Sequence, residues 1–92
     1  MNKQELVASI SDKTGFTRKD SERALNAFIE SVEQELEKGE RVQLVGFGTF
    51  EVRERKARKG RNPQRPNEVI DIPAGRVPTF KAGKGFKEII NK

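Results

Sequence analysis

The sequence contains no cysteine and no histidine. Without cysteine the chain has neither disulfides nor a thiolate nucleophile, which fits a reducing compartment. Because both residue types are missing, a structural zinc site is not expected. An enzyme is the least favoured class of protein, since no histidine, cysteine or clustered pair of carboxylates is available as a general base or nucleophile. We therefore expect no catalytic residue, no metal site, no cofactor and no small-molecule substrate.

Long apolar runs are absent as well. No stretch approaches the roughly 20 apolar residues that a membrane-spanning helix needs. The opening residues, MNKQELVASI, lack the basic and then apolar order of a secretory signal. The basic part of the chain has no amphipathic helical period, which argues against a membrane-surface binder. We therefore expect a cytoplasmic protein with no membrane partner.

Positive charge is concentrated in the second half of the chain, although the formal net charge is only +5. Of 19 lysines and arginines 7 precede Phe47, and of 14 acidic residues 9 do, so the second half carries 12 basic against 5 acidic residues. This asymmetry favours an anionic polymer over a small ligand as partner. A chain of 92 residues makes one domain and buries only a little more than about 60% of its unfolded surface. Assembly with a second copy would relieve such a thin core.

Capping signals and apolar spacing predict two N-terminal helices. Asn2, with Glu5 three residues later, starts the first helix, which ends at Thr14-Gly15. Thr17 repeats the arrangement with Asp20. The second helix carries an apolar stripe at steps of three and four that ends at Gly39, with these members: Leu25, Phe28, Ile29, Val32 and Leu36. Its glutamates form a solvated face.

From Arg41 the apolar period changes to two. Apolar residues alternate with others over residues 42–45 and again over residues 50–53, on either side of the sequence Gly46-Phe47-Gly48. This pattern predicts two strands joined by a glycine-flanked turn. At the C-terminus, KAGKGFKEIINK predicts a short helix in spite of its glycines. Glycines at a helix start let a backbone or a phosphate approach the free N–H groups, and a loosely capped terminus is an equally good interpretation.

Residues 53–65, RERKARKGRNPQR, carry seven basic residues and one acid. A strand made of them has no apolar face to bury, so it cannot pack on the body of the protein. Apolar alternation returns at residues 69–72 and 77–80. We therefore predict a body of residues 1–52 and 77–92 and a protruding hairpin arm of residues 53–76.

An arm of this composition is suited to bind DNA. Its cations neutralise phosphates and release counterions, and a two-stranded ribbon fits a groove of duplex DNA. At its tip, Pro63 lacks an N–H group and is a rigid apolar wedge that can enter between base pairs. The simpler interpretation is that Asn62-Pro63 only makes a turn.

Long motifs in the chain resemble the HU family of bacterial histone-like DNA-binding proteins. They are MNKQELV, KGERVQLVGFGTFEVRERKARKGRNPQ and IDIPAGRVPTFKAGKGFK, and they cover nearly the whole chain. The resemblance implies an α+β fold with two N-terminal helices, a three-stranded antiparallel sheet with a long protruding β-hairpin arm, and a short C-terminal helix. It also implies an intertwined dimer whose arms embrace duplex DNA in the minor groove and bend it, as the family is known to do.

Matching positions carry the family's binding residues over to this chain. The implied DNA contacts are Lys3, Gly46, Arg53, Arg55, Arg58, Lys59, Arg61, Asn62, Pro63, Lys81, Gly83 and Lys84, with Pro63 as the intercalating wedge. Lys56, Gln64, Arg65 and Arg76 are predicted as further DNA contacts. The implied dimer core is Phe28, Val32, Leu36, Leu44, Phe47, Phe50 and Phe80. The implied location is the nucleoid in the cytoplasm.

The tip of the arm departs from the family pattern. After RNPQ the family has a short turn with glycine, whereas this chain reads RPNEV and holds one residue more before IDIP. Arg65 adds a charge and Pro66 stiffens the return strand. Asn67 is suited to the left-handed conformation that a turn needs.

Two further alternatives remain at this point. The six phenylalanines are expected to pack in the core, but base stacking would make the protein a binder of single strands. No phenylalanine lies inside the basic run, which favours packing. The main interpretation is a non-specific architectural DNA-binding protein that compacts DNA and prefers bent, nicked or otherwise distorted duplexes. The alternative is a sequence-selective relative similar to integration host factor.

Overall fold

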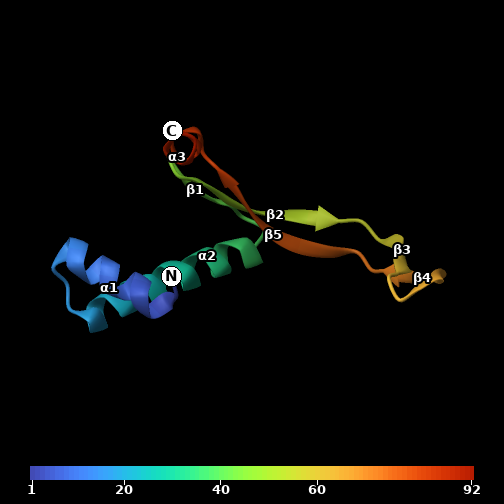
Figure 1. The fold of residues 1–92 in the computed structure, drawn as a ribbon, viewed down its shortest axis with the longest axis horizontal. Coiled ribbons are helices and arrows are strands. Elements are labelled where there is room, and N and C mark those ends of the chain that lie inside the picture. Colours follow the sequence, from blue (N-terminus) through green and yellow to red (C-terminus); the bar gives the residue numbers. More distant parts are fainter.

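The computed structural model describes the backbone of residues 1–92 and every side chain except that of Pro66. The expectation that Pro66 stiffens the arm therefore lies outside the described side chains. The elements, in chain order, are α1 (Lys3–Thr14), α2 (Arg18–Glu37), β1 (Val42–Leu44), β2 (Gly48–Arg55), β3 (Arg58–Asn62), β4 (Arg65–Ile72), β5 (Gly75–Ala82) and α3 (Lys84–Ile90). The predicted α+β fold is confirmed: helices α1 and α2 form one layer, and the sheet above them extends into an arm (Figure 1).

Both N-terminal helices begin at the predicted caps. The Asn2 side chain accepts a hydrogen bond from the Glu5 N–H, and the Thr17 hydroxyl accepts one from the Asp20 N–H. These bonds satisfy N–H groups that have no partner within the helix. Helix α1 ends at Gly15, whose φ of 79° is the left-handed conformation that glycine adopts without strain.

Helices α1 and α2 pack as a hairpin. Val7 is 3% exposed, and Ser21 is 0% exposed. The Ser21 hydroxyl has no hydrogen-bond partner among the described residues. A buried hydroxyl without a partner lowers stability. Ser21→Ala is therefore expected to stabilise the helix hairpin.

The three strands of the body are antiparallel in the order β1-β2-β5. Strand β2 pairs with β5 from Gly48 opposite Ala82 to Arg55 opposite Gly75. Alternate residues of a strand point to opposite faces of its sheet. Phe50, Val52 and Glu54 therefore share the face toward α2, which we call the inner face. The other face, which we call the outer face, carries Thr49, Glu51, Arg53 and Arg55 of β2 together with Lys81 of β5.

A chain of phenylalanine contacts fills the space under the inner face. Phe28 of α2 contacts Phe50 edge to face at 6.3 Å between ring centroids, and Phe50 lies 4.8 Å from Phe80. Phe47 stacks on Phe86 of α3 at 5.1 Å. Five of the six phenylalanines thus belong to one cluster, and none of the six lies in the arm. Packing, as expected from the sequence, is the role that these contacts give them.

The arm ends in a second ladder of β3 and β4. The first ladder breaks only at residues 56–57 and 73–74, so residues 53–55 and 75–76 still pair within the three-stranded sheet. The radius of gyration is 18.5 Å, whereas a compact chain of this length would have about 12 Å. The arm projects at one end and helices α1 and α2 extend beyond the sheet at the other, which gives the molecule a long dimension of 57 Å (Figure 1).

One chain buries very little apolar surface. Among the described residues, only Val7 and Leu36 count as buried apolar side chains. Phe28, Phe47 and Phe80 remain 43%, 43% and 39% exposed in spite of their contacts. On α3, Ile89 and Ile90 are 64% and 69% exposed. The predicted thin core is therefore present, with apolar surface left over on α2, the sheet and α3.

Candidate nucleic-acid interface

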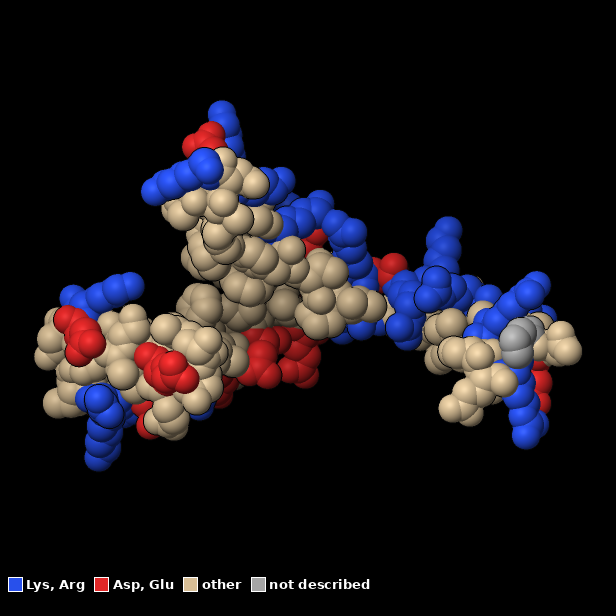
Figure 2. Space-filling view, in the orientation of Figure 1, with Lys and Arg blue, Asp and Glu red and all other residues tan. Residues whose placement is uncertain are grey.

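The outer face of the sheet gathers three of the predicted DNA contacts. Arg53 and Arg55 follow each other at a step of two on β2, and Lys81 lies opposite Thr49 on β5. The side chains of Arg53 and Lys81 are 58% and 61% exposed. Figure 2 shows lysine and arginine along this side of the sheet and on the arm, while acidic residues gather below the body. Strand alternation thus brings Arg53, Arg55 and Lys81 to one face of the sheet.

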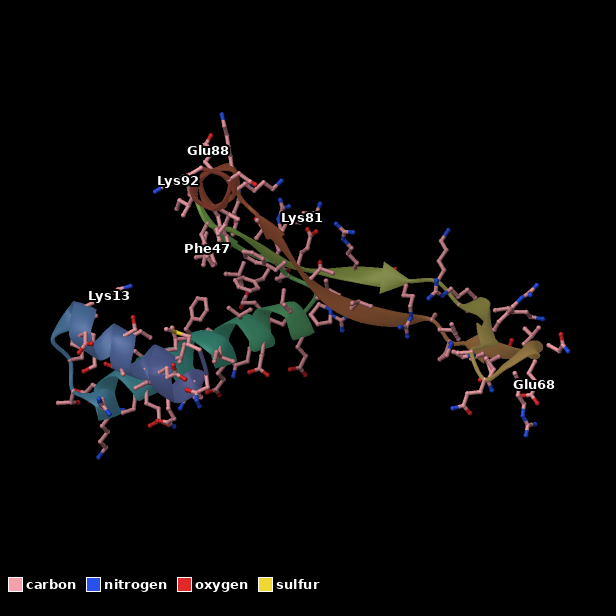
Figure 3. All side chains as sticks on the ribbon, viewed as in Figure 1. Lys13, Phe47, Glu68, Lys81, Glu88 and Lys92 are labelled. Carbon is pink, nitrogen blue, oxygen red and sulfur yellow. The ribbon has the colours of Figure 1, made fainter. Side chains whose placement is uncertain are left out.

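A carboxylate that sequence reasoning missed lies among these cations. Glu51 Oε1 is 3.4 Å from Lys81 Nζ and 3.6 Å from Arg53 Nε. The Glu51 side chain is only 20% exposed, so the two cations cover it. Figure 3 shows Lys81 on the side of the sheet away from α2. The alternation of residues 49–53 contained the signal, since it places Glu51 and Arg53 on the same face.

Arg76 was predicted as a DNA contact, but the structure does not bring it together with these cations. It is opposite Glu54 in the ladder and therefore belongs to the inner face. Its Nη2 donates hydrogen bonds to the carbonyl oxygens of Leu36, at 2.8 Å, and Glu37, at 3.0 Å. These are the last residues of α2. The guanidinium is directed to the helical layer.

The distal arm carries most of the remaining predicted contacts. Arg58, Lys59 and Arg61 lie on β3, and Lys56 precedes it. Within the part of the chain whose side chains are described, none of these four cations makes an ion pair. Arg65 on β4 pairs with Glu68 at 3.1 Å.

The apolar residues of β4 are exposed. Val69 and Ile70 are 62% and 44% exposed, so the apolar pattern of residues 69–72 lies in the arm and not in the body.

Pro63 lies at the apex of the arm. Asn62 pairs with Arg65 across the turn, and the Asn62 side-chain oxygen accepts a hydrogen bond of 3.0 Å from the Gln64 N–H. The ladder register then shifts, because Arg61 pairs with Val69. Residues 66–68 are therefore extra residues on β4 alone, as in a bulge. The irregular part of the ladder is therefore on the β4 side, and Pro63 lies in the turn between Asn62 and Arg65.

The expectation for Asn67 was wrong. Asn67 lies in β4, and among the described residues only glycines have a positive φ. A bulge lengthens one strand while its residues keep negative φ, whereas a tight turn at Asn67 would have needed the left-handed conformation. Asn67 therefore lies in the irregular part of the strand and not in the turn.

The predicted backbone contacts of the body, Gly46 and Gly83, lie where the β1–β2 turn meets α3. The Gly83 N–H donates a hydrogen bond of 2.7 Å to the Phe47 carbonyl. A Cβ atom on Gly85 would lie 2.9 Å from the Gly46 carbonyl oxygen, so glycine is required by the close approach of two backbones. Of the two interpretations of the C-terminal glycines, contact with another backbone is thus observed. The Gly83 N–H is already occupied.

Two lysines of the body complete the predicted set. Lys84 is the first residue of α3 and Lys3 is the first residue of α1. One chain does not bring them together, because α1 lies in the helical layer and α3 lies at the end of the sheet away from the arm (Figure 1).

The described residues include no cluster of three or more potential metal ligands. No helix among them is long and apolar enough to cross a membrane.

Comparison with known proteins agrees with this arrangement. The family model described as bacterial DNA-binding protein matches residues 1–91. The DNA-binding protein HU of Clostridium pasteurianum is 66% identical over 92 residues, which is 100% of each chain. This chain belongs to the HU family of bacterial DNA-binding proteins. The HU protein of Lactococcus lactis subsp. lactis is 61% identical over 89 residues, 97% of each chain.

Solved HU structures have the same fold. A cocrystal structure of Anabaena HU with DNA matches with a TM-score of 0.90 at 50% identity, over 98% of this chain and 97% of that one. HU from Thermotoga maritima matches with a TM-score of 0.71 at 36% identity, over 98% of each chain. The resemblance seen in the sequence and the α+β architecture are thus confirmed.

Proposed function

We propose that this protein is a non-sequence-specific architectural DNA-binding protein that bends and compacts duplex DNA in the bacterial nucleoid. The observation that carries the proposal is the arm, in which the exposed cations Arg58, Lys59 and Arg61 make no ion pair among the described side chains and lead to a proline at the apex. Anabaena HU, which shares the fold at 50% identity, is bound to DNA in its crystal. Membership of the HU family also argues against an enzyme.

The cations of the arm and of the outer face supply the affinity. Arg58, Lys59 and Arg61 make no ion pair among the described side chains, so no carboxylate has to be displaced when phosphates approach them. Each phosphate that a lysine or arginine neutralises releases a condensed counterion, which gives binding that depends on salt and not on sequence. A ribbon of two strands is narrow enough to enter a groove of the duplex.

Pro63 supplies the bend. At the apex it leads the arm, it has no N–H group to satisfy, and its ring is rigid and apolar. Inserting such a wedge between base pairs costs a few kcal/mol of stacking, and the bent duplex then contacts more protein surface. Distorted or nicked DNA has lost part of this stacking already, so the protein is expected to prefer it.

A homodimer completes the interface. Phe28, Phe47 and Phe80 keep about two fifths of their surface exposed in one chain, and Ile89 and Ile90 keep more. Apolar surface of this extent is typical of an interface between subunits. We propose that a second copy covers it with the dimer core predicted from the sequence, of which Leu36 is already buried within one chain. Two arms then project from one body and enclose the duplex.

Gel-shift titration of three duplexes tests this function. The DNA set consists of linear, nicked and cruciform duplexes of equal length, each made in two unrelated sequences. The protein should bind cruciform and nicked DNA more tightly than linear DNA. It should bind the two sequences with equal affinity. A protein similar to integration host factor would instead prefer one sequence by a factor of about 10³ or more. Failure to bind any duplex at low salt would contradict the proposal.

A further inference from the structure

The C-cap residue of α2, Lys38, is a cation, but its ammonium is paired with the Glu35 carboxylate at 3.3 Å. The last turn of α2 contains no basic residue, and it does contain Glu35 and Glu37. The C-terminus of a helix carries a partial negative charge and carbonyl groups without partners inside the helix. Two carboxylates beside it are unfavourable, and helices are usually completed here by a lysine, arginine or histidine. Because Lys38 is paired with Glu35, the carbonyl oxygens of this turn are left for a cation from another part of the chain.

Arg76 of β5 supplies it. One nitrogen of its guanidinium donates to both the Leu36 and the Glu37 carbonyl oxygens, at 2.8 Å and 3.0 Å. Leu36 is a buried residue, so the contact reaches the packed part of the body. Arg76 has a carboxylate directly across the ladder, on Glu54, but no ion pair joins the two among the described side chains. The guanidinium is thus committed to the helix end.

This contact lies where the arm leaves the body. Arg76 is the second residue of β5, next to the point where the first ladder ends. An open groove of about 300 Å³ lies between α2 and the sheet at this point, lined by Leu36, Val52, Pro78 and Arg76 together with two glutamates of α2. Apolar packing there is incomplete. Within the described part of the chain, the two Arg76 bonds are the only side-chain hydrogen bonds between a strand and α2.

We propose that Arg76 is a positioning residue that fixes the base of the arm to the end of α2, and that it is not a phosphate contact. Its side chain belongs to the inner face, whereas Arg53, Arg55 and Lys81 belong to the outer face. Removing the two Arg76 hydrogen bonds leaves the cations of the outer face and the arm in place and frees the arm base to move. DNA must then order a mobile arm on binding, which costs affinity at every salt concentration.

Arg55 offers a matched control. It lies at the same height of the arm base, opposite Gly75, and it belongs to the outer face. Among the described side chains it makes no ion pair. Arg55→Gln and Arg76→Gln therefore remove the same charge from the same segment but different contacts. The titration described below rests on the proposed function, because it requires DNA binding. The relaxation measurement requires neither DNA nor a particular oligomeric state.

Backbone ¹⁵N relaxation of the free protein is the first measurement. In Arg76→Gln, order parameters of residues 53–55 and 75–77 should fall from about 0.85 toward 0.6, the range of flexible backbone. In Arg55→Gln they should stay at the wild-type values. Unchanged order parameters in Arg76→Gln would overturn the proposal whatever happens with DNA.

Titration of linear DNA over a range of salt concentrations is the second measurement. Arg55→Gln should lower the slope of log K against log salt by about 0.9 for each phosphate that is no longer neutralised. Arg76→Gln should keep the wild-type slope and shift the whole line to weaker binding. A slope lowered as much as in Arg55→Gln would make Arg76 a phosphate contact and overturn the proposal. If no variant binds DNA, the proposed function fails and the relaxation result still decides the role of Arg76.

Arg76→Lys keeps the test decisive if Arg76→Gln does not fold. Both Arg76 bonds come from Nη2 at the far end of the guanidinium. The lysine side chain retains the charge, but it ends short of that position and its ammonium is strongly hydrated, so the contact should be weakened. The salt slope of this variant should equal that of the wild type, and the order parameters of residues 75–77 should fall to an intermediate value. Order parameters equal to those of the wild type in Arg76→Lys would show that the paired hydrogen bonds do not hold the arm.

Discussion

Glu51 and Lys81 form an ion pair across the outer face, with 3.4 Å between Glu51 Oε1 and Lys81 Nζ. Because Arg53 shares the same carboxylate oxygen at 3.6 Å, one negative charge lies between two cations that are expected to meet phosphates. A fixed carboxylate lowers the positive potential at this place and competes with DNA for both cations. The Glu51 carboxylate is therefore expected to weaken DNA binding at the outer face.

Glu51→Gln should tighten DNA binding. The substitution keeps the size of the side chain and removes the charge, so affinity for linear DNA at about 100 mM salt is expected to rise by about fivefold to tenfold. Glu54→Gln is the control, because it changes the net charge equally on the inner face of the same strand. Fluorescence titration of a labelled duplex measures both. Weaker binding in Glu51→Gln would mean that the carboxylate positions Arg53 and Lys81 and does not compete for them.

Arg61→Ala should weaken binding and make it less sensitive to salt. With about 6 to 10 phosphate contacts per dimer, the affinity of the wild type should fall by roughly 10³ to 10⁵ between about 50 and 200 mM salt. Each phosphate that the variant no longer neutralises lowers the slope by about 0.9. Titrations at four salt concentrations on two unrelated sequences give the slopes. A wild-type affinity that does not change with salt would contradict the electrostatic basis of the proposed function.

Pro63→Ala should separate bending from binding. Every positive charge remains, so the salt slope on linear DNA should barely change while the bend decreases. Energy transfer between the two ends of a short labelled duplex measures the bend, and the variant should depend more than the wild type on nicked DNA.

Pro66→Ala is the control for this prediction. It removes a proline from the return strand and leaves the apex unchanged, so bending should persist. Loss of bending in Pro66→Ala with normal bending in Pro63→Ala would show that the longer return strand has moved the wedge away from Pro63.

Ser21→Ala should stabilise the protein. The buried Ser21 hydroxyl has no partner among the described residues, and removing an unsatisfied buried polar group is worth about 1 to 3 kcal/mol. Helix propensity adds a few tenths of a kcal/mol, which Ser31→Ala on the exposed side of α2 measures alone. Urea denaturation at one protein concentration gives both values. Equal gains in the two variants would mean that the Ser21 hydroxyl has a hydrogen-bond partner after all.

The chain should be a dimer without a stable folded monomer. The apolar surface left exposed on α2, the sheet and α3 is too large for a body of this size to tolerate in water. Sedimentation equilibrium at micromolar concentration should give twice the chain mass, and the melting temperature should rise with protein concentration. A folded monomer at the same concentration would contradict the dimer.

Local signals determined most of the elements. The caps at Asn2 and Thr17 act within three residues of their own positions, so they could be located from the sequence, and the structure has both of them. The change from helical spacing to a period of two located β1 and β2 for the same reason. The arm was predictable because a segment with seven basic residues has nothing to bury against a body.

Pairing between distant segments decided the rest. The extra residue of the arm was visible in the sequence, but only the register of Arg61 with Val69 shows that the ladder is irregular on the β4 side. The expectation for Asn67 was wrong because it assumed a change in the turn. Register is the pairing of residues that face each other on two strands, and it cannot be read from the composition of either strand.

The sequence alone established that this protein has a basic arm, because the number and positions of its lysines and arginines do not depend on the fold. Which cations belong to the arm's outer surface was decided only by the tertiary structure. Arg53 and Arg76 look equivalent in the sequence, yet the pairing of β2 with β5 puts Arg53 beside Glu51 on the outer face and Arg76 against the end of α2. The physical reason is that a side chain's partner is set by the face and the register of its strand, and these arise only when segments 40 residues apart, such as Leu36 and Arg76, come together.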